Sequence, residues 1–596
     1  MRRPSLASLM ILALALGFGS GALEVGLRAS SQRGMGPGDV AAWVAVSVGL
    51  TTGLLAVVAL IGRLVRRKPY GMLVGSLFFV HAALWYRFDI VLNNFGSDPK
   101  VWGGLLLILA LSILVGLALD SLVERGRMAI SLLGLAAGAL GLSLAVARSA
   151  PEEGQPRGTR KNILVVTVDT LRADRIAPYG ADNPTPTFSR LAREGVLFET
   201  VVATAPTTEP SHLAIFTGQP PFQSGVVANG TKLGDRPALL WHALKQAGYS
   251  TGGFVAGFPL HGRFGWSQGM DVYDDDFGSF RGLHSLSIVK AWDQLTLPGH
   301  TLRERRGDQV VGRALGFIDQ HRDDAFFLWV HLFDPHAPYE APDHPFDPPT
   351  DGQPLTLPFY WPPAHKAITS TDWLVEAYDA EIRYTDALVG QLVEALRMRN
   401  LLDETIIVLT ADHGESLTEH DYLFDHGDTL HDPSLLIPLI VRYPGVARPG
   451  HRVPCQVSNE DVTPTLLSLL GLADLPEQKA IERAGRDLSS ALRGASCTDA
   501  PVVSSTVSER FVDEPPVDFS YRVPQRKLIR RGADGAQICH DLAADPGELA
   551  DAGCAPQVAP LLDAVLEGRT QTLAPQTDSA TNAALEALGY IDPDQE

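Results

Sequence analysis

The sequence predicts an α/β fold with a mostly parallel sheet, preceded by a bundle of about five transmembrane helices and followed by a small C-terminal subdomain. Two observations support this prediction. The first 150 of the 596 residues are mostly Leu, Ala, Gly and Val, whereas the rest has the mixed composition of a soluble enzyme. In that second part, short continuous apolar runs alternate with helical patterns, as in a parallel sheet covered by helices.

The apolar N-terminal region contains five segments, each near the ~20 residues that a bilayer-spanning helix needs. They run about from Leu6 to Leu27, Val40 to Ile61, Tyr70 to Leu92, Val101 to Leu119 and Met128 to Ala147. Basic residues are concentrated in the loops on one side, so the positive-inside rule places the N-terminus in the cytoplasm. Five spans then carry the C-terminal body to the outer face of the plasma (inner) membrane. Without the third segment, which holds Arg87 and Asp89, the body would be cytoplasmic.

The charge is distributed unevenly along the chain. The first 150 residues have a formal charge of +7, so the remainder carries −26 within the net charge of −19. Such an acidic body argues against a nucleic-acid partner. We expect a transmembrane region at 1–148, a linker at 149–161, a catalytic domain at 162–500 and a C-terminal subdomain at 501–596. The sequence does not indicate an oligomeric state.

All four cysteines lie in the last quarter of the chain, and none belongs to a CxxC pair. An even number without metal-ligand spacing favours two disulfides in an oxidising compartment, which we expect to join Cys455 with Cys497 and Cys539 with Cys554. Four unrelated buried thiols are the alternative on count alone.

Beyond the linker, the α/β pattern can be followed element by element. The run from Ile163 to Val168 has the continuous apolar character of a buried parallel strand. The pattern then predicts a helix from Pro237 to Ala247 and strands from Tyr249 to Ala256, Phe326 to His331 and Thr405 to Thr410. Before the last of these strands, residues recur at helical spacing and predict a second helix: Tyr378, Ile382, Thr385, Val389, Leu392 and Leu396. The proline-rich region from Glu340 to Lys366, with Phe359, Tyr360 and Trp361, is either a surface loop or a lid over the site.

A short helix is predicted within residues 207–218. Pro210 is expected at its first position and Gly218 just past its end. A hydroxyl there would lie at the positive end of the helix, which favours an alkoxide and an incoming anion. Thr208 is therefore the candidate nucleophile. The alternative is that Thr207 or Thr208 only caps the helix.

Four polar residues follow predicted strands: Asp169, His336, Asp412 and His413. In parallel sheets, ligands bind beyond the carboxyl ends of the strands, so these positions converge by topology. With Thr208, they offer two carboxylates, a hydroxyl and imidazole. Asp169, Thr208, Asp412 and His413 form a mixed oxygen and nitrogen set that suits one divalent metal ion, Zn or Mn in preference to Ca or Mg.

Several ordered motifs resemble the sulfatase family of the alkaline phosphatase superfamily. They are NILVVTVDTLRADR at 162–175, TPTFSRLAREGVLFE at 185–199, TEPSHLAIFTG at 208–218, HLFDPHAPY at 331–339, YDAEIRYTD at 378–386, TADHGE at 410–415 and LEALGYID at 585–592. The resemblance implies that Thr208 is the nucleophile and that Asp169, Asp412 and His413 bind the metal. It also implies that His336 handles the leaving group or the substrate anion, and that His426 is a further cation on the substrate side. For His426, a surface histidine is the alternative.

Three positions depart from the family pattern. Sulfatases carry at the position of Thr208 a Cys or Ser that is oxidised to an aldehyde, whereas threonine cannot be converted to that group. They also have Arg where this chain has His212, and usually a second Asp where it has Thr170. In layout, the chain resembles membrane phosphoethanolamine transferases and lipoteichoic acid synthases, which use a threonine nucleophile.

The leading functional hypothesis is a membrane-anchored, metal-dependent hydrolase or transferase. It would act on phosphate or sulfate esters of envelope lipids or glycans through a covalent Thr208 intermediate. Its partners would be the lipid bilayer and an anionic lipid or glycan ester. One alternative is a sulfuric ester hydrolase that uses no formylglycine, and another is a catalytically silent membrane-anchored binding protein.

Overall fold

The computed structural model describes residue 158 and residues 160–567, apart from 235–238, 278–303, 359–360, 363, 480 and 508–515. The five predicted membrane segments and the motif at 585–592 lie outside the described residues. Within the described ranges, no helix is long and apolar enough to cross a membrane. Except for Asp276 and Phe277, the described residues belong to one compact unit.

An eight-stranded mixed sheet forms the centre of this unit, in the order β4-β3-β5-β1-β6-β7-β2-β8. Only β7 runs antiparallel to its two neighbours, so the predicted mostly parallel sheet is confirmed. The strands are β1 (Asn162–Val168), β2 (Val196–Val202), β3 (Ser250–Phe254), β4 (Val272–Asp274), β5 (Phe326–Leu332), β6 (Thr405–Ala411), β7 (Leu436–Arg442) and β8 (His451–Ser458).

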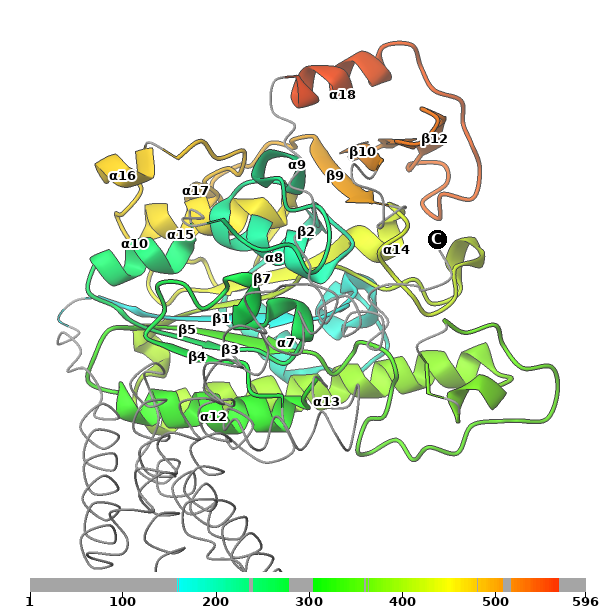
Figure 1. Cartoon of the computed structure of the whole chain (residues 1–596). Helices are drawn as coiled ribbons and strands as arrows, with labels where there is room; N and C mark the ends of the chain where they lie inside the picture. The colour runs from blue at the N-terminus through cyan, green and yellow to red at the C-terminus, as the bar shows by residue number, and fades with distance from the viewer. Residues whose placement is uncertain are drawn as a thin grey trace, which may run out of the picture. The chain divides into compact units, whose positions relative to one another are not determined.

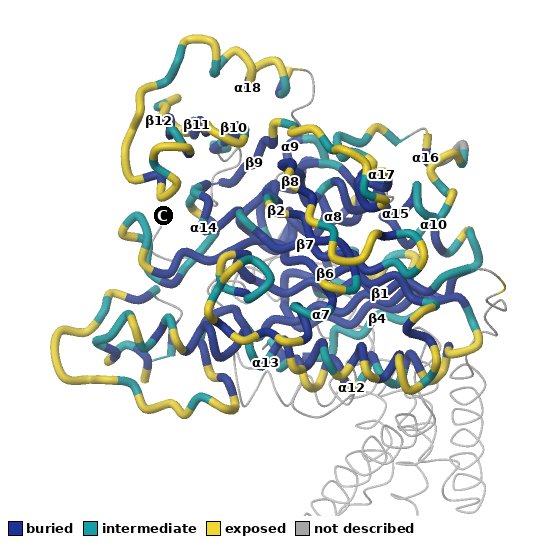
Figure 2. The backbone as a smooth tube through the Cα atoms, turned by 180° about the vertical axis from the view of Figure 1, so that it is seen from behind, coloured by how far each residue is buried: buried dark blue, intermediate teal, exposed yellow. Residues whose placement is uncertain are grey.

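Helices cover both faces of the sheet (Figure 1). One layer contains α7 (Pro186–Glu194), α12 (Gly307–Gln320) and α13 (Thr371–Met398), and the opposite layer contains α8 (Thr208–Thr217), α10 (Leu240–Gln246) and α15 (Val462–Leu469). The strands between these layers are almost wholly buried, and the outer sides of the helices are exposed (Figure 2). Burial on both faces explains why β1, β5 and β6 are continuous apolar runs in the sequence. All six periodic positions predicted for α13 are buried.

An aromatic cluster holds α8 against the sheet. The ring of Phe216 on α8 lies 4.7 Å from that of Trp329 on β5 and 5.3 Å from that of Trp241 on α10, measured between centroids. Trp266 lies 5.7 Å from Trp329. These side chains are fully buried. Edge-to-face and tilted packing of this kind fixes the position of α8, and therefore of its N-terminus.

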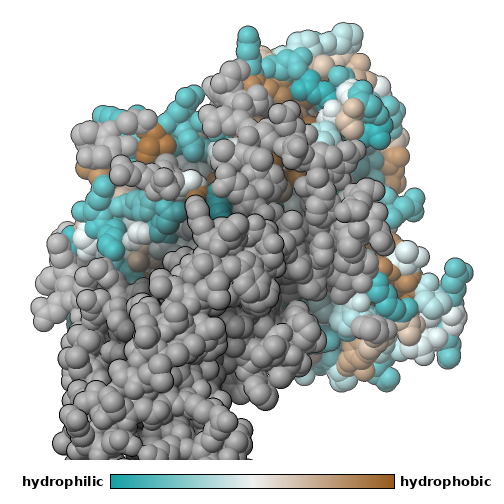
Figure 3. All heavy atoms as spheres, viewed as in Figure 1, coloured by the Kyte–Doolittle hydropathy of each residue, from teal (hydrophilic) through white to brown (hydrophobic). Residues whose placement is uncertain are grey.

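The C-terminal subdomain is a four-stranded antiparallel sheet in the order β12-β11-β10-β9, with α18 (Val558–Leu566). Its strands are β9 (Val502–Val507), β10 (Val517–Val523), β11 (Arg526–Arg530) and β12 (Gln537–Asp541). Hydrophobic and hydrophilic residues are interspersed over its surface (Figure 3). Both predicted disulfides are confirmed: Cys455 with Cys497 and Cys539 with Cys554.

The predicted start of α8 is wrong. Thr207 is extended (φ −137°) and occupies the N-cap position, so the helix begins at Thr208 and Pro210 is its third residue. Because the N–H groups of the whole first turn lack helical partners, proline is tolerated there without marking the first residue. The predicted end is confirmed, since Gly218 caps the helix with φ 74°.

Candidate metal and ester-binding site

Neighbouring strands bring the acidic residues of the site together. β1 and β6 pair in parallel with Val168 opposite Ala411, so the residues that follow them, Asp169 and Asp412, leave the sheet side by side. The N-terminus of α8 adds Thr208. Adjacent parallel strands that end at the same edge are the usual place for a ligand in such sheets.

Three ligand atoms converge at this edge. His413 Nε2 lies 3.6 Å from Asp169 Oδ1 and 3.6 Å from Asp412 Oδ2. The second oxygen of Asp412, Oδ1, accepts hydrogen bonds from the N–H groups of His413 (2.8 Å) and Thr170 (3.3 Å). All three side chains are fully buried. The backbone therefore holds one oxygen of Asp412, while the other faces the site.

Thr170 adopts a strained backbone conformation to make this arrangement. Its φ is 54°, which costs about 1–3 kcal/mol for a residue other than glycine. The conformation is held from both sides: the Thr170 N–H donates to Asp412, and the Thr170 carbonyl accepts from the Tyr378 hydroxyl at 2.7 Å. Strain that the surroundings maintain in this way is common at functional sites.

The polar atoms that point into the site make no hydrogen bond of ordinary geometry with the described residues. These atoms are both oxygens of Asp169, Oδ2 of Asp412 and Nε2 of His413. Burial and then the charge of Glu415 raise the pKa of Asp169; burial and then the charge of Asp169 raise that of Asp412. Buried carboxylate oxygens that lack a hydrogen-bond partner are costly, and a divalent cation is a group that can satisfy them. The donor set of two oxygens and one imidazole nitrogen therefore fits such an ion.

Thr208 lies at the N-terminus of α8, beside the carboxylates. It is the first residue of this helix and is fully buried, and its Oγ1 makes no ordinary hydrogen bond with the described residues. Its hydroxyl is nevertheless close enough to Asp169 to act against the upward shift of that pKa. Thr207 occupies the N-cap position, but its side chain accepts no hydrogen bond from the first turn. The capping alternative is therefore wrong for Thr208 and is met by Thr207 in position only.

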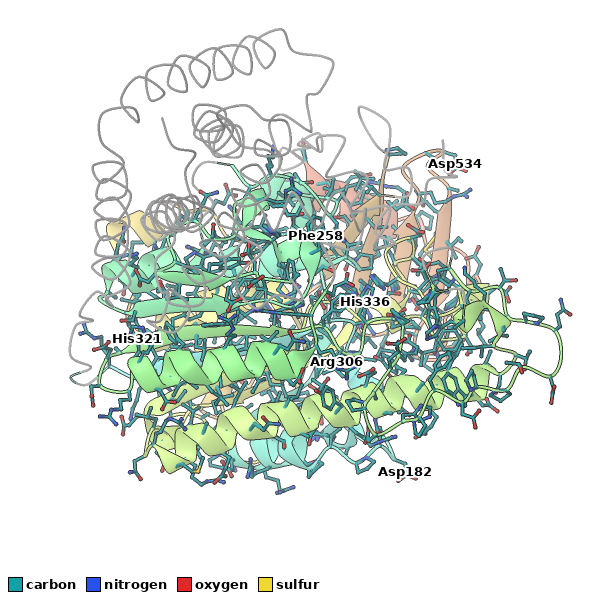
Figure 4. The ribbon with its side chains drawn as sticks, turned by 60° about the horizontal axis from the view of Figure 1, so that its bottom comes forward. Asp182, Phe258, Arg306, His321, His336 and Asp534 are labelled. Carbon is teal, nitrogen blue, oxygen red and sulfur yellow. A yellow bond between two sulfur atoms is a disulfide. The ribbon has the colours of Figure 1, made fainter. Side chains whose placement is uncertain are left out.

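His336 and His426 complete the inner wall of the site. Their rings lie 4.8 Å apart, and the His426 ring lies 4.5 Å from that of His413. His336 follows β5 and is labelled in Figure 4; its Nδ1 contacts the Ala337 carbonyl at 2.7 Å, so Nδ1 carries a proton in the neutral ring. Burial and then His426 lower the pKa of His336. The His426 side chain is only 7% exposed, so the surface-histidine alternative is wrong.

The sequence analysis assigned no role to four further residues at the site. Glu415 lies fully buried, with Oε2 3.3 Å from His426 Nδ1. His212 and His331 are also fully buried and lie close to Asp412 and Asp169. Asn229 accepts the N–H of Glu209 at 2.8 Å, next to Thr208. His331 is a polar residue inside an apolar run and begins the motif at 331–339, whereas nothing in the sequence pointed to Asn229.

The carboxylate of Glu209 fixes the loop that contains Asn229. Its Oε2 accepts the N–H groups of Gly230 (2.6 Å) and Thr231 (3.1 Å). Because the Glu209 N–H is itself a donor, the Asn229 oxygen must face it, which defines the orientation of the amide. The loop at 229–231 is thereby tied to the first turn of α8.

The region from Glu340 to Lys366 is anchored close to the site by Trp361. This side chain is buried, and its ring lies 5.4 Å from that of Tyr339, which in turn lies 5.5 Å from that of Tyr378. Phe359 and Tyr360 lie outside the described residues. Residues 342–356 are exposed or half-buried, as expected for a surface loop, and the role of this region as a lid stays a prediction.

The fold and the site together define a sulfatase-like hydrolase. A sequence model of the sulfatase family matches residues 161–472, and the chain belongs to this family within the alkaline phosphatase superfamily. The choline-sulfatase of Rhizobium meliloti (strain 1021) is 27% identical over 430 residues, which cover 65% of this chain and 82% of that protein.

Two further relatives extend the comparison. The multifunctional alkaline phosphatase superfamily protein PehA of Trinickia caryophylli is 26% identical over 389 residues, which cover 52% of this chain and 74% of that protein. The crystal structure of the phosphonate monoester hydrolase of Agrobacterium radiobacter superposes with a TM-score of 0.52 at 20% identity, covering 68% of this chain and 94% of the other. The predicted family and the enzyme class are confirmed. The alternative of a catalytically silent protein is therefore dropped.

Proposed function

We propose that the chain is a metal-dependent hydrolase or transferase that acts on phosphate or phosphonate esters through a covalent intermediate on Thr208. The observation that carries the proposal is the position of the Thr208 hydroxyl. It is buried at the positive end of α8, beside Asp169, and within the described part of the chain no hydrogen bond holds it in a structural role. Threonine at this position also rules out the aldehyde chemistry of other sulfatases.

Asp169, Asp412 and His413 would hold the metal, with Thr208 as a fourth ligand. When bound, a divalent ion lowers the pKa of a coordinated hydroxyl and neutralises charge on a tetrahedral anionic ester. Zn or Mn is preferred for a set of two carboxylates and one imidazole, with Ca or Mg as the alternatives.

The proposed reaction consists of two successive displacements at phosphorus. In the first, Thr208 Oγ1 forms a bond to phosphorus as the bond to the leaving oxygen breaks; the Thr208 proton passes to Nε2 of the neutral His336, which delivers it to the leaving oxygen. In the second, His336 accepts a proton from water or from an acceptor hydroxyl, whose oxygen bonds to phosphorus as the bond to Thr208 breaks, and His336 returns that proton to Thr208 Oγ1. His426 lies beside His336 and contributes a second imidazole to the substrate anion.

Replacement of Thr208 by valine tests this proposal. Valine keeps the β-branched shape but removes the hydroxyl, so we expect a loss of kcat of at least about 1,000-fold with little change in folding. Thr208→Ser keeps a hydroxyl and serves as the matched control, which should retain measurable turnover. If Thr208→Val were as active as the wild type, the covalent mechanism would be wrong.

Sulfate ester hydrolysis is a second candidate, favoured by the similarity to the choline-sulfatase of Rhizobium meliloti. In this case Thr208 would attack sulfur directly. Parallel assays with aryl sulfate, aryl phosphate and aryl phosphonate esters separate the two candidates. Turnover of the sulfate ester alone would replace phosphoryl chemistry with sulfuryl chemistry at the same residues.

The substrate class that we propose is an anionic ester of an envelope lipid or glycan, reached from the outer face of the plasma (inner) membrane. The five apolar segments before residue 150 support membrane attachment, and the two disulfides support an oxidising compartment. Protease treatment of intact cells with a permeabilised outer envelope should digest the catalytic domain. Protection of the domain until the inner membrane is opened would place it in the cytoplasm instead.

A further inference from the structure

Two buried histidines lie directly behind the metal-binding carboxylates. His212 is in the second turn of α8, and His331 is near the end of β5; their ring centroids are 5.0 Å apart. Together with Asp412 they form a group whose ligand atoms lie within 4.8 Å of one another. Such a group either holds a second ion or orients the residues that hold the first. The hydrogen bonds of the two rings decide between these roles.

Both nitrogens of His212 are already engaged. Nδ1 lies 2.8 Å from the Thr208 carbonyl, which can only accept, so Nδ1 carries a proton. Nε2 lies 2.9 Å from the hydroxyl of Thr167, and that hydroxyl already accepts the indole N–H of Trp329 at 2.9 Å. The hydroxyl proton of Thr167 is therefore directed to Nε2. Neither nitrogen of His212 has a lone pair available to a cation.

The protonation of His331 is also fixed by a backbone contact. Its Nδ1 accepts the N–H of Ala256 at 3.3 Å, so the ring proton is on Nε2. That nitrogen lies 3.3 Å from Asp169 Oδ2, an approach that is not yet aligned as a hydrogen bond. The other oxygen of Asp169, Oδ1, is the one that faces His413. His331 thus presents an N–H to Asp169 Oδ2, while Oδ1 is the oxygen that approaches His413.

We propose that His212 and His331 are positioning residues, each fixed in one tautomer, and that they orient the ligands of a single metal ion. His331 donates from Nε2 to Asp169 Oδ2 and leaves Oδ1 for the metal. His212 donates from Nδ1 to the Thr208 carbonyl and lies 3.4 Å from Asp412 Oδ2, which fixes the first turn of α8 relative to that carboxylate. The proposal rests on the metal site assigned under the proposed function, and it predicts one ion per chain.

Two substitutions of His331 separate orientation from packing. In His331→Asn, the amide oxygen can replace Nδ1 as acceptor for Ala256, but no donor reaches Asp169. In His331→Gln, the longer amide can place an N–H where Nε2 was. Binding of Zn²⁺ and Mn²⁺ to the metal-free full-length chain is measured by calorimetry, together with the thermal unfolding of each metal-free protein.

We expect His331→Asn to weaken metal binding by about 10- to 100-fold and His331→Gln to retain most of the wild-type affinity, while the metal-free proteins unfold at similar temperatures. Wild-type affinity in His331→Asn would overturn the inference, as would equal losses in two folded variants or two ions per wild-type chain. If the wild type bound neither ion, the metal site of the proposed function would be wrong instead.

Discussion

A buried ionic cluster joins the C-terminal subdomain to the catalytic domain. Lys527 on β11 is fully buried; its Nζ lies 2.8 Å from Asp432 Oδ1 and 2.9 Å from Glu548 Oε1. Arg522 on β10 also binds Asp432, at 2.7 Å between Nη2 and Oδ2. Asp432 is the first residue of α14 (Asp432–Leu435). The cluster therefore holds α14 against the C-terminal sheet.

Replacing Lys527 by methionine should destabilise the domain strongly. Breaking a buried ion pair by removing one partner costs about 3–5 kcal/mol, because a charge is left without compensation. Asp432 keeps Arg522, so the cost comes mainly from Glu548, whose Oε1 loses its cationic partner. We therefore expect about 3 kcal/mol, the lower end of that range. The double variant Lys527→Met/Glu548→Gln removes both charges and should recover about 1–2 kcal/mol.

The same substitution should weaken metal binding, because α14 braces the loop that carries His413. The Gly414 N–H donates to the Ser434 carbonyl at 2.9 Å, and a Cβ added at Gly414 would lie 2.1 Å from the Pro433 carbonyl oxygen. Urea unfolding of the metal-free and metal-loaded proteins measures both effects. A loss below about 1 kcal/mol, as for an exposed ion pair, would refute the reasoning.

Three further predictions concern conditions and cross-links. Burial acts to raise the pKa of Glu419, but the charge and hydrogen bond of Arg172 and the N–H groups of Leu417 and Thr418 outweigh it and lower this pKa to about 2. The ionised Glu419 side chain stabilises the fold fully at a pH above 4.5, the ordinary pKa of glutamate, and this contribution is lost as the pH falls towards 2. The difference in unfolding free energy between wild type and Glu419→Gln should therefore shrink between these two pH values. A constant difference would contradict the assignment. Replacing both cysteines of a disulfide by serine should lower the free energy of unfolding, by about 4 kcal/mol for Cys455–Cys497, which spans 42 residues, and by about 3 kcal/mol for Cys539–Cys554, which spans 15. Denaturant unfolding measures both values. Variants as stable as the wild type would refute this prediction. Removal of the metal by a chelator should abolish turnover and lower the melting temperature, because the buried carboxylates of Asp169 and Asp412 then lack a cation between them. Restoration of activity by Zn²⁺ or Mn²⁺ would identify the ion. Full activity in the presence of chelator would contradict the metal assignment.

The sequence was sufficient for the parts of the fold that depend on local pattern and topology. Continuous apolar runs indicated β1, β5 and β6 because these strands are buried on both faces. Their carboxyl ends then placed Asp169 and Asp412 side by side without any closeness in sequence. The cysteine pairing followed from number and spacing.

The residues behind the site could not be found in the same way. His212 and His331 contact the carboxylates through tertiary packing, and each resembles an ordinary buried histidine in the sequence. Asn229 acquires its position only through the carboxylate of Glu209. The first residue of α8 was misplaced because proline is compatible with several positions of the first turn, whereas the backbone of Thr207 sets the boundary.

The most direct test of the account is to trap the covalent intermediate. The full-length chain is mixed with an aryl phosphate or aryl phosphonate ester, quenched in acid and digested, and the peptide containing Thr208 is analysed by mass spectrometry. The account predicts an increment equal to the transferred group on Thr208, absent from Thr208→Val. Turnover in both proteins without any adduct on this peptide would contradict it.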